Sequence, residues 1–284
     1  MNSVKHPWNV LKKSLGELYL FVSRRYLERI SHKRRMKILF SRKEDWEPVI
    51  RWNFRYTQHE LTFGNLSVEN IEKYDLIVPL TIDDIKYLNG VRHLIINNPI
   101  PIPTTESLCL CDDKRLFNQT LIENNFGNFI PTMSNELQVP YILKKKIDGF
   151  GVNSHVIYDR EQELKFPEAA SSQDYFRQEL VPGKYEYATH ILFSKGKIVH
   201  SINIEYTFET DIFIKGKNKQ ISMKKVSQCL YLSAFSSILN LIGFEGLCCV
   251  NYKVIDNQPL IFEINPRFGG SLCNHFFSFM KYLD

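Results

Sequence analysis

The polar residues best suited to chemistry lie near the C-terminus, in the run Glu263-Ile264-Asn265-Pro266-Arg267. Glu263 and Asn265 stand two residues apart in an apolar segment, so on a β-strand their side chains point to the same face. They bring carboxylate and amide oxygens with one negative charge, and Asn251 on the preceding predicted strand adds another amide oxygen. A hard divalent cation such as Mg²⁺ prefers these ligands. We therefore predict a metal site at Asn251, Glu263 and Asn265.

Arg267 suits an anionic group beside that site, because a guanidinium holds phosphate or carboxylate oxygens through two parallel hydrogen bonds. A strand whose end merely carries surface polar residues would have the same composition. The segment by itself leaves both interpretations open.

A second polar segment contains Gly149 and Gly151 and follows a predicted strand that ends in the lysines Lys144 to Lys146. Glycines let backbone N–H groups approach phosphate oxygens closely. A lysine at the strand end supplies a positive charge for the same phosphates. Taken alone, the segment is more typical of a plain turn between two strands than of a phosphate site.

The third segment runs from Gln178 to Tyr187 and is interrupted by Pro182-Gly183. An edge strand here can offer backbone groups to an adenine ring, while a glutamate accepts hydrogen bonds from ribose hydroxyls. Without the other two segments, this pattern would indicate only two strands joined by a turn.

Together and in this order, the segments resemble the ATP-grasp superfamily, the carboxylate–amine ligases that include D-alanine–D-alanine ligase and relatives of carbamoyl-phosphate synthase and biotin carboxylase. The resemblance covers about residues 110 to 272. Its most specific part is the run from Glu263 to Ser271, followed by the seven-residue step from Glu179 to Glu186.

The resemblance implies a role for each matching position. The residues that it assigns to the ATP phosphates are Lys114, Lys144 with Lys146 as the alternative, and Lys215, which contacts either phosphate or substrate. Those that it assigns to adenine are Glu179, Leu180 and Val181, with Glu186 for the ribose. The lid over the triphosphate is the segment from Gly149 through Gly151 to Asn153. The residues that it assigns to the metal ion, Mg²⁺ with Mn²⁺ as second candidate, are Asn251, Glu263 and Asn265. The residues that it assigns to catalysis are Lys144 and Arg267.

Three features depart from the family pattern. Asn251 stands where many relatives carry an acidic residue or glutamine, which removes a negative charge from the metal site. Lys145 replaces the usual proline after the strand lysine. Phe150 is bulky for a short phosphate-covering segment.

The activity that the resemblance implies is amide formation. A small carboxylate, such as an amino acid or sugar acid, attacks the γ-phosphate of ATP, and an amine then attacks the acyl phosphate. Two alternatives stay open: a phosphotransferase that stops after phosphorylating its substrate, and a protein that binds nucleotide without turnover. Five basic residues could also face substrate, although surface or core positions explain each as well: Arg51, Arg55, Arg177, His190 and His200.

The elements that position these residues indicate an α/β (α+β) chain in three parts. Residues 1–35 are a basic amphipathic helical leader, residues 36–112 an N-terminal lobe with a parallel sheet, and residues 113–284 the ATP-grasp domain, whose lid subdomain spans about 113–180. Strands are predicted at 36–40, 75–80, 92–96, 140–144, 155–158, 176–181, 187–193, 248–255 and 259–264. Helices are predicted at 113–125 and 224–242.

Composition is that of a soluble globular protein, with 44% hydrophobic and 24% charged residues among 284. The sequence contains no apolar run long enough to cross a bilayer and no secretory signal pattern, so we expect a cytoplasmic protein. Six cysteines lack metal-binding spacing and are expected to be free thiols, mostly buried.

Charge is uneven along the chain. Residues 1–35 carry nine Lys or Arg against two Glu, a net charge of +7, which leaves −2 of the total +5 for the remainder. The body is therefore not a nucleic-acid binder on charge grounds.

In the leader, apolar residues recur at three- and four-residue steps from Val10 to Ile30. Such a helix either contacts a partner or an anionic membrane surface, or packs its stripe on the body. The chain extends only 17 residues beyond Arg267, so a second subunit of a homo-oligomer is a candidate for one wall of the substrate site.

Overall fold

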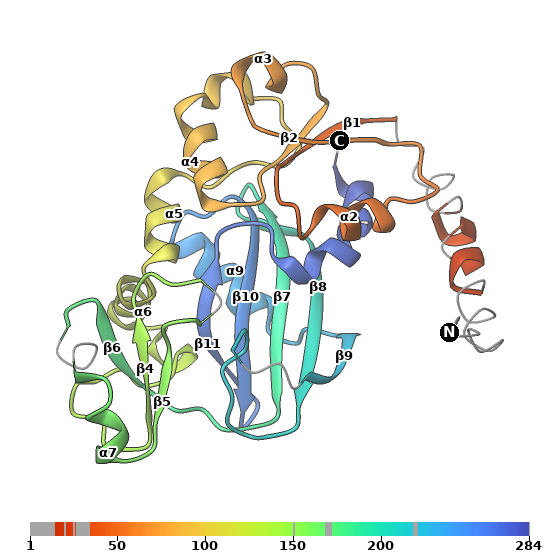
Figure 1. The fold of residues 1–284 in the computed structure, drawn as a ribbon. Coiled ribbons are helices and arrows are strands. Elements are labelled where there is room, and N and C mark those ends of the chain that lie inside the picture. The colour runs from red at the N-terminus through yellow and green to blue at the C-terminus, as the bar shows by residue number, and fades with distance from the viewer. Residues whose placement is uncertain are drawn as a thin grey trace.

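The computed structural model describes residues 15–19, 21–24, 26, 35–149, 151–167, 172–217 and 221–283. Three sheets organise these residues, with strand orders β2-β1-β3, β11-β10-β7-β8-β9 and β5-β4-β6. Figure 1 shows the first sheet above the long strands of the second, while the third forms a separate layer beside α6. This mixed α/β arrangement agrees with the predicted fold class.

The first sheet is parallel, with β1 (Lys37–Ser41) between β2 (Glu60–Gly64) and β3 (Leu76–Val78). The crossovers carry α2 (Glu47–Asn53) and α3 (Val68–Ile71), and α4 (Ile82–Gly90) and α5 (Thr105–Asp112) follow β3. Ile38 and Phe40 face one hydrophobic cluster and Leu39 faces another. Both faces of the sheet are therefore buried, as is usual for parallel strands.

The predicted strand at 92–96 is wrong, because η1 (Arg92–Leu94) is a 3₁₀ helix and the third strand is the unpredicted β2. The physical reason lies on the outer edge of β3. The Asn98 side chain accepts from Ile77 N at 2.8 Å and donates to Ile77 O at 3.0 Å. These backbone groups are already satisfied, so no further strand is needed at that edge.

The second sheet is antiparallel and contains β7 (Tyr185–Ser194), β8 (Lys197–Phe208), β9 (Ile221–Ser227), β10 (Gly246–Ile255) and β11 (Gln258–Asn265). One of its faces packs against the helices α6 (Lys114–Glu123) and α9 (Leu232–Leu241). Side chains alternate between the faces of a strand, so every second residue is left for the opposite face. That opposite face carries the polar residues described below.

The predicted helix at 224–242 is wrong in its first part, because residues 224–227 belong to β9 and the helix begins only at Leu232. Pairing with β8, itself unpredicted, decides this: Lys225 lies opposite Glu205, and their side chains form an ion pair at 3.0 Å. The helix ends as predicted, with Gly243 at φ +59°.

The third sheet places β4 (Tyr141–Lys145) between β5 (His155–Ile157) and β6 (Tyr175–Glu179), with α7 (Arg160–Glu163) in the connection. These strands and the helix that starts at Lys114 lie where they were predicted. The hairpin between β10 and β11 is confirmed too. Its turn residues Asp256 and Asn257 have φ of +48° and +62°, which matches the twist of a tight two-residue turn.

The C-terminal 3₁₀ helices η3 (Gly270–Asn274) and η4 (Phe276–Tyr282) join the first sheet to the second. Their phenylalanines share a cluster with β1 and α2, in which Phe276 packs edge-on against Phe40. A short 3₁₀ helix, η2 (Gly127–Phe129), follows α6. The strand end that carries Glu263 therefore continues into the buried boundary between the two sheets.

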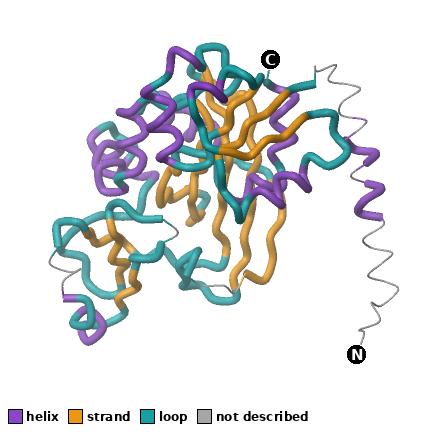
Figure 2. Tube along the Cα trace, turned by 45° about the horizontal axis from the view of Figure 1, so that its top comes forward, coloured by secondary structure: helices purple, strands orange, loops and turns teal. Residues whose placement is uncertain are grey.

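The leader is helical at residues 15–19, 21–24 and 26, and its other predicted residues up to 34 lie outside the described part. Its apolar stripe does not pack on the body where it is described, because Leu15, Leu18, Tyr19, Val22 and Tyr26 are exposed. Figure 2 shows these helical residues on the side of the molecule away from the third sheet.

The six cysteines are free, and four of them are buried. No helix in the described residues is long and apolar enough to cross a membrane.

Candidate active site

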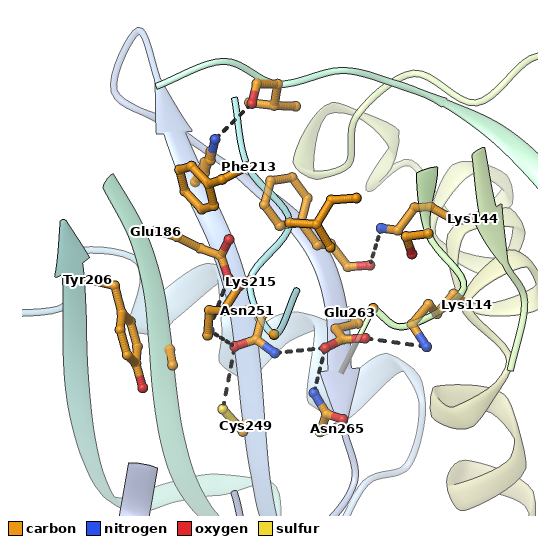
Figure 3. A pocket seen from close by; sticks show the side chains of 18 of the residues that line it. Lys114, Lys144, Glu186, Tyr206, Phe213, Lys215, Cys249, Asn251, Glu263 and Asn265 are labelled. Carbon is orange, nitrogen blue, oxygen red and sulfur yellow. Dashed lines mark hydrogen bonds and ion pairs between the residues drawn. The ribbon is translucent and has the colours of Figure 1, made fainter. Parts of the chain in front are cut away.

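A cavity of about 280 Å³ lies between the third sheet and the polar face of the second (Figure 3). Strands β4 and β6 form one wall, and β7, β8, β10 and β11 form the other. Among its described lining residues, five cations face three carboxylates. They are Lys114, Lys144, Lys215, Lys253 and Arg267 against Glu179, Glu186 and Glu263. The surplus of positive charge suits an anionic ligand.

The strand register aligns the polar residues in rows. Each row takes one residue from β7, β10 and β11 in turn: His190, Cys249 and Asn265, then Ala188, Asn251 and Glu263. Lys253 follows Asn251 on the same face of β10 and also lines the cavity. The predicted metal-binding residues Asn251, Glu263 and Asn265 are thus brought together by pairing of β10 with β11.

A β-bulge lies next to these rows. Asn251 pairs with Glu263 but Tyr252 pairs with Ile261, so Phe262 is an extra residue on β11. Both Phe262 and Glu263 consequently line the cavity, although neighbours on a regular strand point to opposite faces.

Glu263 is the electrostatic centre of the cavity. Its Oε1 accepts hydrogen bonds from the Nδ2 atoms of Asn251 and Asn265, both at 2.9 Å, and its Oε2 lies 3.4 Å from Lys114 Nζ. Burial disfavours the ionised carboxylate, but Lys114 and Lys144 outweigh burial and lower the pKa of Glu263 to about 2. The carboxylate is therefore charged at neutral pH.

Lys144 projects from β4 into the cavity. Its Nζ donates to Gln178 Oε1 at 3.0 Å and lies 3.5 Å from Phe262 O. Burial lowers the pKa of this lysine to about 8, although Glu263 favours its charged form. Lys146, the alternative, instead forms an ion pair with Asp174 at 2.8 Å and does not line the cavity.

Lys114 enters from the first turn of α6. The preceding Asp113 caps the helix by accepting from Arg115 N and Leu116 N, which fixes where the helix starts. Lys114 Nζ donates to Asp148 O at 2.7 Å, so it links the helix to the glycine segment as well as to Glu263.

Lys215 was expected to contact phosphate or substrate, and Glu186 was expected to contact the ribose. In the structure the two side chains contact each other. Lys215 Nζ lies 3.0 Å from Glu186 Oε1 and donates to Asn251 Oδ1 at 2.9 Å. Burial opposes the charge of Lys215, yet Glu186 raises the pKa of the lysine to about 12. A ligand that contacts both side chains must break the ion pair between Lys215 and Glu186 and replace it with its own contacts.

Glu179, Leu180 and Val181 line one end of the cavity. Val181 O accepts from Lys253 Nζ at 2.9 Å, and the same ammonium lies 4.1 Å from the centre of the Phe213 ring. The Glu179 side chain accepts from Thr132 N at 3.0 Å. This end is thus lined by a strand edge and by apolar and aromatic surface.

In the glycine segment, Gly151 lines the cavity and Gly149 does not. Gly151 has φ +64°, and a Cβ there would come within 2.7 Å of Ile214 Cγ2, so the position requires glycine. A Cβ on Gly149 would meet nothing within 4 Å. Phe150 lies outside the described residues.

The opposite end holds Arg267, His190 and Ser271. His190 Nε2 lies 2.6 Å from Ser271 Oγ. Burial lowers the pKa of His190 to about 3, so the ring is neutral, and its buried Nδ1 has no hydrogen-bond partner among the described residues. Arg267 donates from Nη1 to Phe268 O at 2.9 Å.

Of the five additional basic candidates, only His190 lines the cavity. Several lining residues escaped the sequence reasoning: Tyr206, Phe213, Cys249, Lys253 and Phe262. Two of these carried a usable signal, because Cys249 and Lys253 flank Asn251 at two-residue steps on one strand. Tyr206 lies on the unpredicted strand β8.

The residue types at Asn251, Glu263 and Asn265 would suit one hard cation once both amide groups turn their oxygens toward it, because here their nitrogens face Glu263 and Asn251 Oδ1 accepts from Lys215. Within the described residues no group of three or more His, Cys, Asp and Glu could hold a metal. One carboxylate and two amides nevertheless meet within hydrogen-bonding distance. Mg²⁺ is commonly held by one or two carboxylates together with substrate phosphates, and the surrounding lysines provide for such phosphates.

Solved structures of similar shape include ligases and a synthetase, all at low sequence identity. D-alanine–D-alanine ligase from Bacillus anthracis, in complex with ATP, has a TM-score of 0.56 and 15% identity, over 82% of this chain and 87% of that one. L-amino acid ligase from Bacillus licheniformis has a TM-score of 0.59 and 14% identity, over 86% of this chain and 70% of that one. N5-carboxyaminoimidazole synthetase from Staphylococcus aureus, in complex with ADP, has a TM-score of 0.56 and 14% identity, over 83% of this chain and 71% of that one. These likenesses establish the fold.

A search of curated proteins finds no significant match. A family model described as an ATP-grasp domain matches residues 111–271, which is more than half of the chain and contains every residue that lines the cavity, from Lys114 to Ser271. The chain therefore belongs to the ATP-grasp family.

Proposed function

We propose that the protein is an ATP- and Mg²⁺-dependent ligase that joins a small carboxylate to an amine through an acyl phosphate. The observation that carries the proposal is one cavity in which Glu263 contacts Asn251, Asn265 and Lys114, and which Lys144 also lines. Such a cluster combines oxygen donors for a cation with positive charge for phosphates.

The order of residues along β10 supports this assignment. Lys253, Asn251 and Cys249 follow one another on one face at about 7 Å per step. Adenine occupies the end at Val181 and Lys253, with its edge toward the backbone of Glu179 to Val181. The phosphates lie at Asn251, and the acceptor substrate lies beyond, near Cys249.

At the middle position, Lys114 and Lys144 hold the phosphates, and Glu186 turns from Lys215 to the ribose hydroxyls. Lys215 is then free to contact the γ-phosphate. Mg²⁺ bound at Asn251, Glu263 and Asn265 would neutralise charge on the phosphate oxygens. Phosphoryl transfer depends on this kind of positioning and charge neutralisation more than on covalent help from the protein.

At the far end, Arg267 holds the substrate carboxylate in line with the γ-phosphate. A carboxylate oxygen attacks the phosphorus and ADP leaves. The amine nitrogen then attacks the acyl carbon and phosphate leaves, which yields the amide. Gly151 lines the cavity beside Ile214. We infer that the segment around Gly151 acts as the lid that keeps water from the acyl phosphate.

The test is an ADP-release assay with purified protein, ATP and Mg²⁺, against panels of amino acids and sugar acids with and without amines. We expect ADP and phosphate only when a carboxylate and an amine are both present, and a product mass without phosphate. A phosphorylated product formed without an amine would instead identify a phosphotransferase. Tight ATP binding with no turnover in any mixture would identify a nucleotide-binding protein.

A further inference from the structure

One face of the leader helix contacts the rest of the protein. Glu17 forms an ion pair with Arg55 at 2.6 Å and accepts a hydrogen bond from Tyr56 Oη at 2.7 Å. Phe21 packs edge-on against Tyr56 with ring centres 5.5 Å apart. Glu17 and Phe21 are four residues apart, so they lie on the same face of a helix.

Arg24 completes this inner face. Its Nε donates to the backbone oxygen of Asn53 at 3.0 Å, and its guanidinium lies 4.6 Å from the centre of the Phe277 ring. Because Arg24 stands three residues after Phe21, all three side chains share one side of the helix. The contacts with α2 and η4 fix which way the helix faces.

The opposite face is apolar and open. We define the leader stripe as Leu15, Leu18, Tyr19, Val22 and Tyr26. At 3.6 residues per turn, these residues fall on the side facing away from Glu17, Phe21 and Arg24. Their exposed fractions are 57, 59, 73, 56 and 63%. Five contiguous apolar side chains this exposed mark an interaction surface.

Charge indicates what covers the stripe. Residues 1–35 contain nine Lys or Arg and two Glu. Glu17 is paired with Arg55, Arg35 is paired with Glu60, and Arg24 lies on the inner face, which leaves seven other basic residues in the leader. An apolar stripe within such a basic segment is complementary to anionic lipid headgroups above acyl chains. Two leaders brought face to face would instead repel each other through their net positive charge.

We propose that the leader stripe docks the protein on an anionic lipid bilayer, with the helix lying in the plane of the interface. The contacts at α2 and η4 hold the helix at the surface of the folded chain, so the stripe meets the bilayer while the body remains in water. In Figures 1 and 2 the helix lies on the side away from the third sheet, which forms one wall of the cavity. Docking therefore leaves that side of the cavity clear.

The experiment is co-sedimentation of the full chain with vesicles of phosphatidylcholine alone and of phosphatidylcholine mixed with phosphatidylserine. We expect binding to the mixed vesicles, little binding to phosphatidylcholine, and weaker binding at high salt. The double variant Leu18→Glu/Val22→Glu should lower the partition coefficient by about 10-fold or more, because two apolar side chains no longer enter the bilayer.

Ile96→Glu is the control, since Ile96 is 77% exposed but lies just after η1 and outside the leader, and this variant should bind as the unchanged protein does. A thermal shift with ATP and Mg²⁺ verifies that each variant is folded. Absence of binding to the mixed vesicles overturns the proposal, as does undiminished binding of the double variant. Self-association in sedimentation velocity that the double variant abolishes, without vesicle binding, would assign the stripe to a second copy and overturn it too.

Discussion

Replacing Glu263 by Gln tests the electrostatic centre of the cavity directly. The variant keeps the size of the side chain and an acceptor for Asn251 and Asn265, but it removes the charge that faces Lys114 and Lys144. Those lysines lower the pKa of Glu263 from 4.5 to about 2 despite its burial. Each pKa unit corresponds to about 1.4 kcal/mol, so the charge stabilises the fold by up to about 3 kcal/mol at neutral pH.

The pH dependence has a definite sign. A carboxylate whose pKa is lowered on folding contributes stability above its unfolded pKa, and this contribution is lost as pH falls toward the folded pKa. The difference in unfolding free energy between the two proteins should therefore still be present at pH 5. It should narrow only as pH falls below 4.5 toward 2.

The assay is urea unfolding across this pH range in the absence of nucleotide. Glu161→Gln is the control, because Glu161 pairs with Lys165 at the surface with its side chain 85% exposed, and such pairs contribute about 1 kcal/mol or less. With ATP, Mg²⁺ and an identified substrate pair, Glu263→Gln should also lower the rate by about 100-fold or more. Unchanged stability at pH 7 would refute the electrostatic reasoning, and unchanged turnover would refute the proposed metal site.

Three further perturbations test other parts of the site. Gly151→Ala should weaken ATP binding about 10-fold in a calorimetric titration. The reason is that a left-handed backbone costs a non-glycine residue about 1–2 kcal/mol and that the new Cβ clashes. The control variant Gly149→Ala should bind ATP normally in the same titration. ATP affinity should fall as pH rises through about 8, where Lys144 loses its proton, and a calorimetric series in which Lys144→Met keeps that slope would contradict the assignment. Ser271→Ala should raise KM for the acceptor about 10-fold and leave ATP affinity unchanged; steady-state kinetics showing the opposite pattern would place Ser271 at the nucleotide.

The family and the central cluster were readable from the sequence because both are local. Glu263 and Asn265 share a face through the two-residue period of a single strand, and the tight turn at Asp256-Asn257 pairs that strand with the one bearing Asn251. The cap at Asp113 likewise set the start of the helix that carries Lys114. Each of these features depends on residues close together in the chain.

Long-range pairing decided the rest. Strands β2 and β8 are defined by partners on other segments, so the local pattern at 92–96 and 224–227 was misleading. The same holds for the choice of Lys144 over Lys146 as the cavity lysine, and for the direction of the leader stripe. Local periodicity specifies which side chains share a face, whereas only the packed chain determines what that face meets.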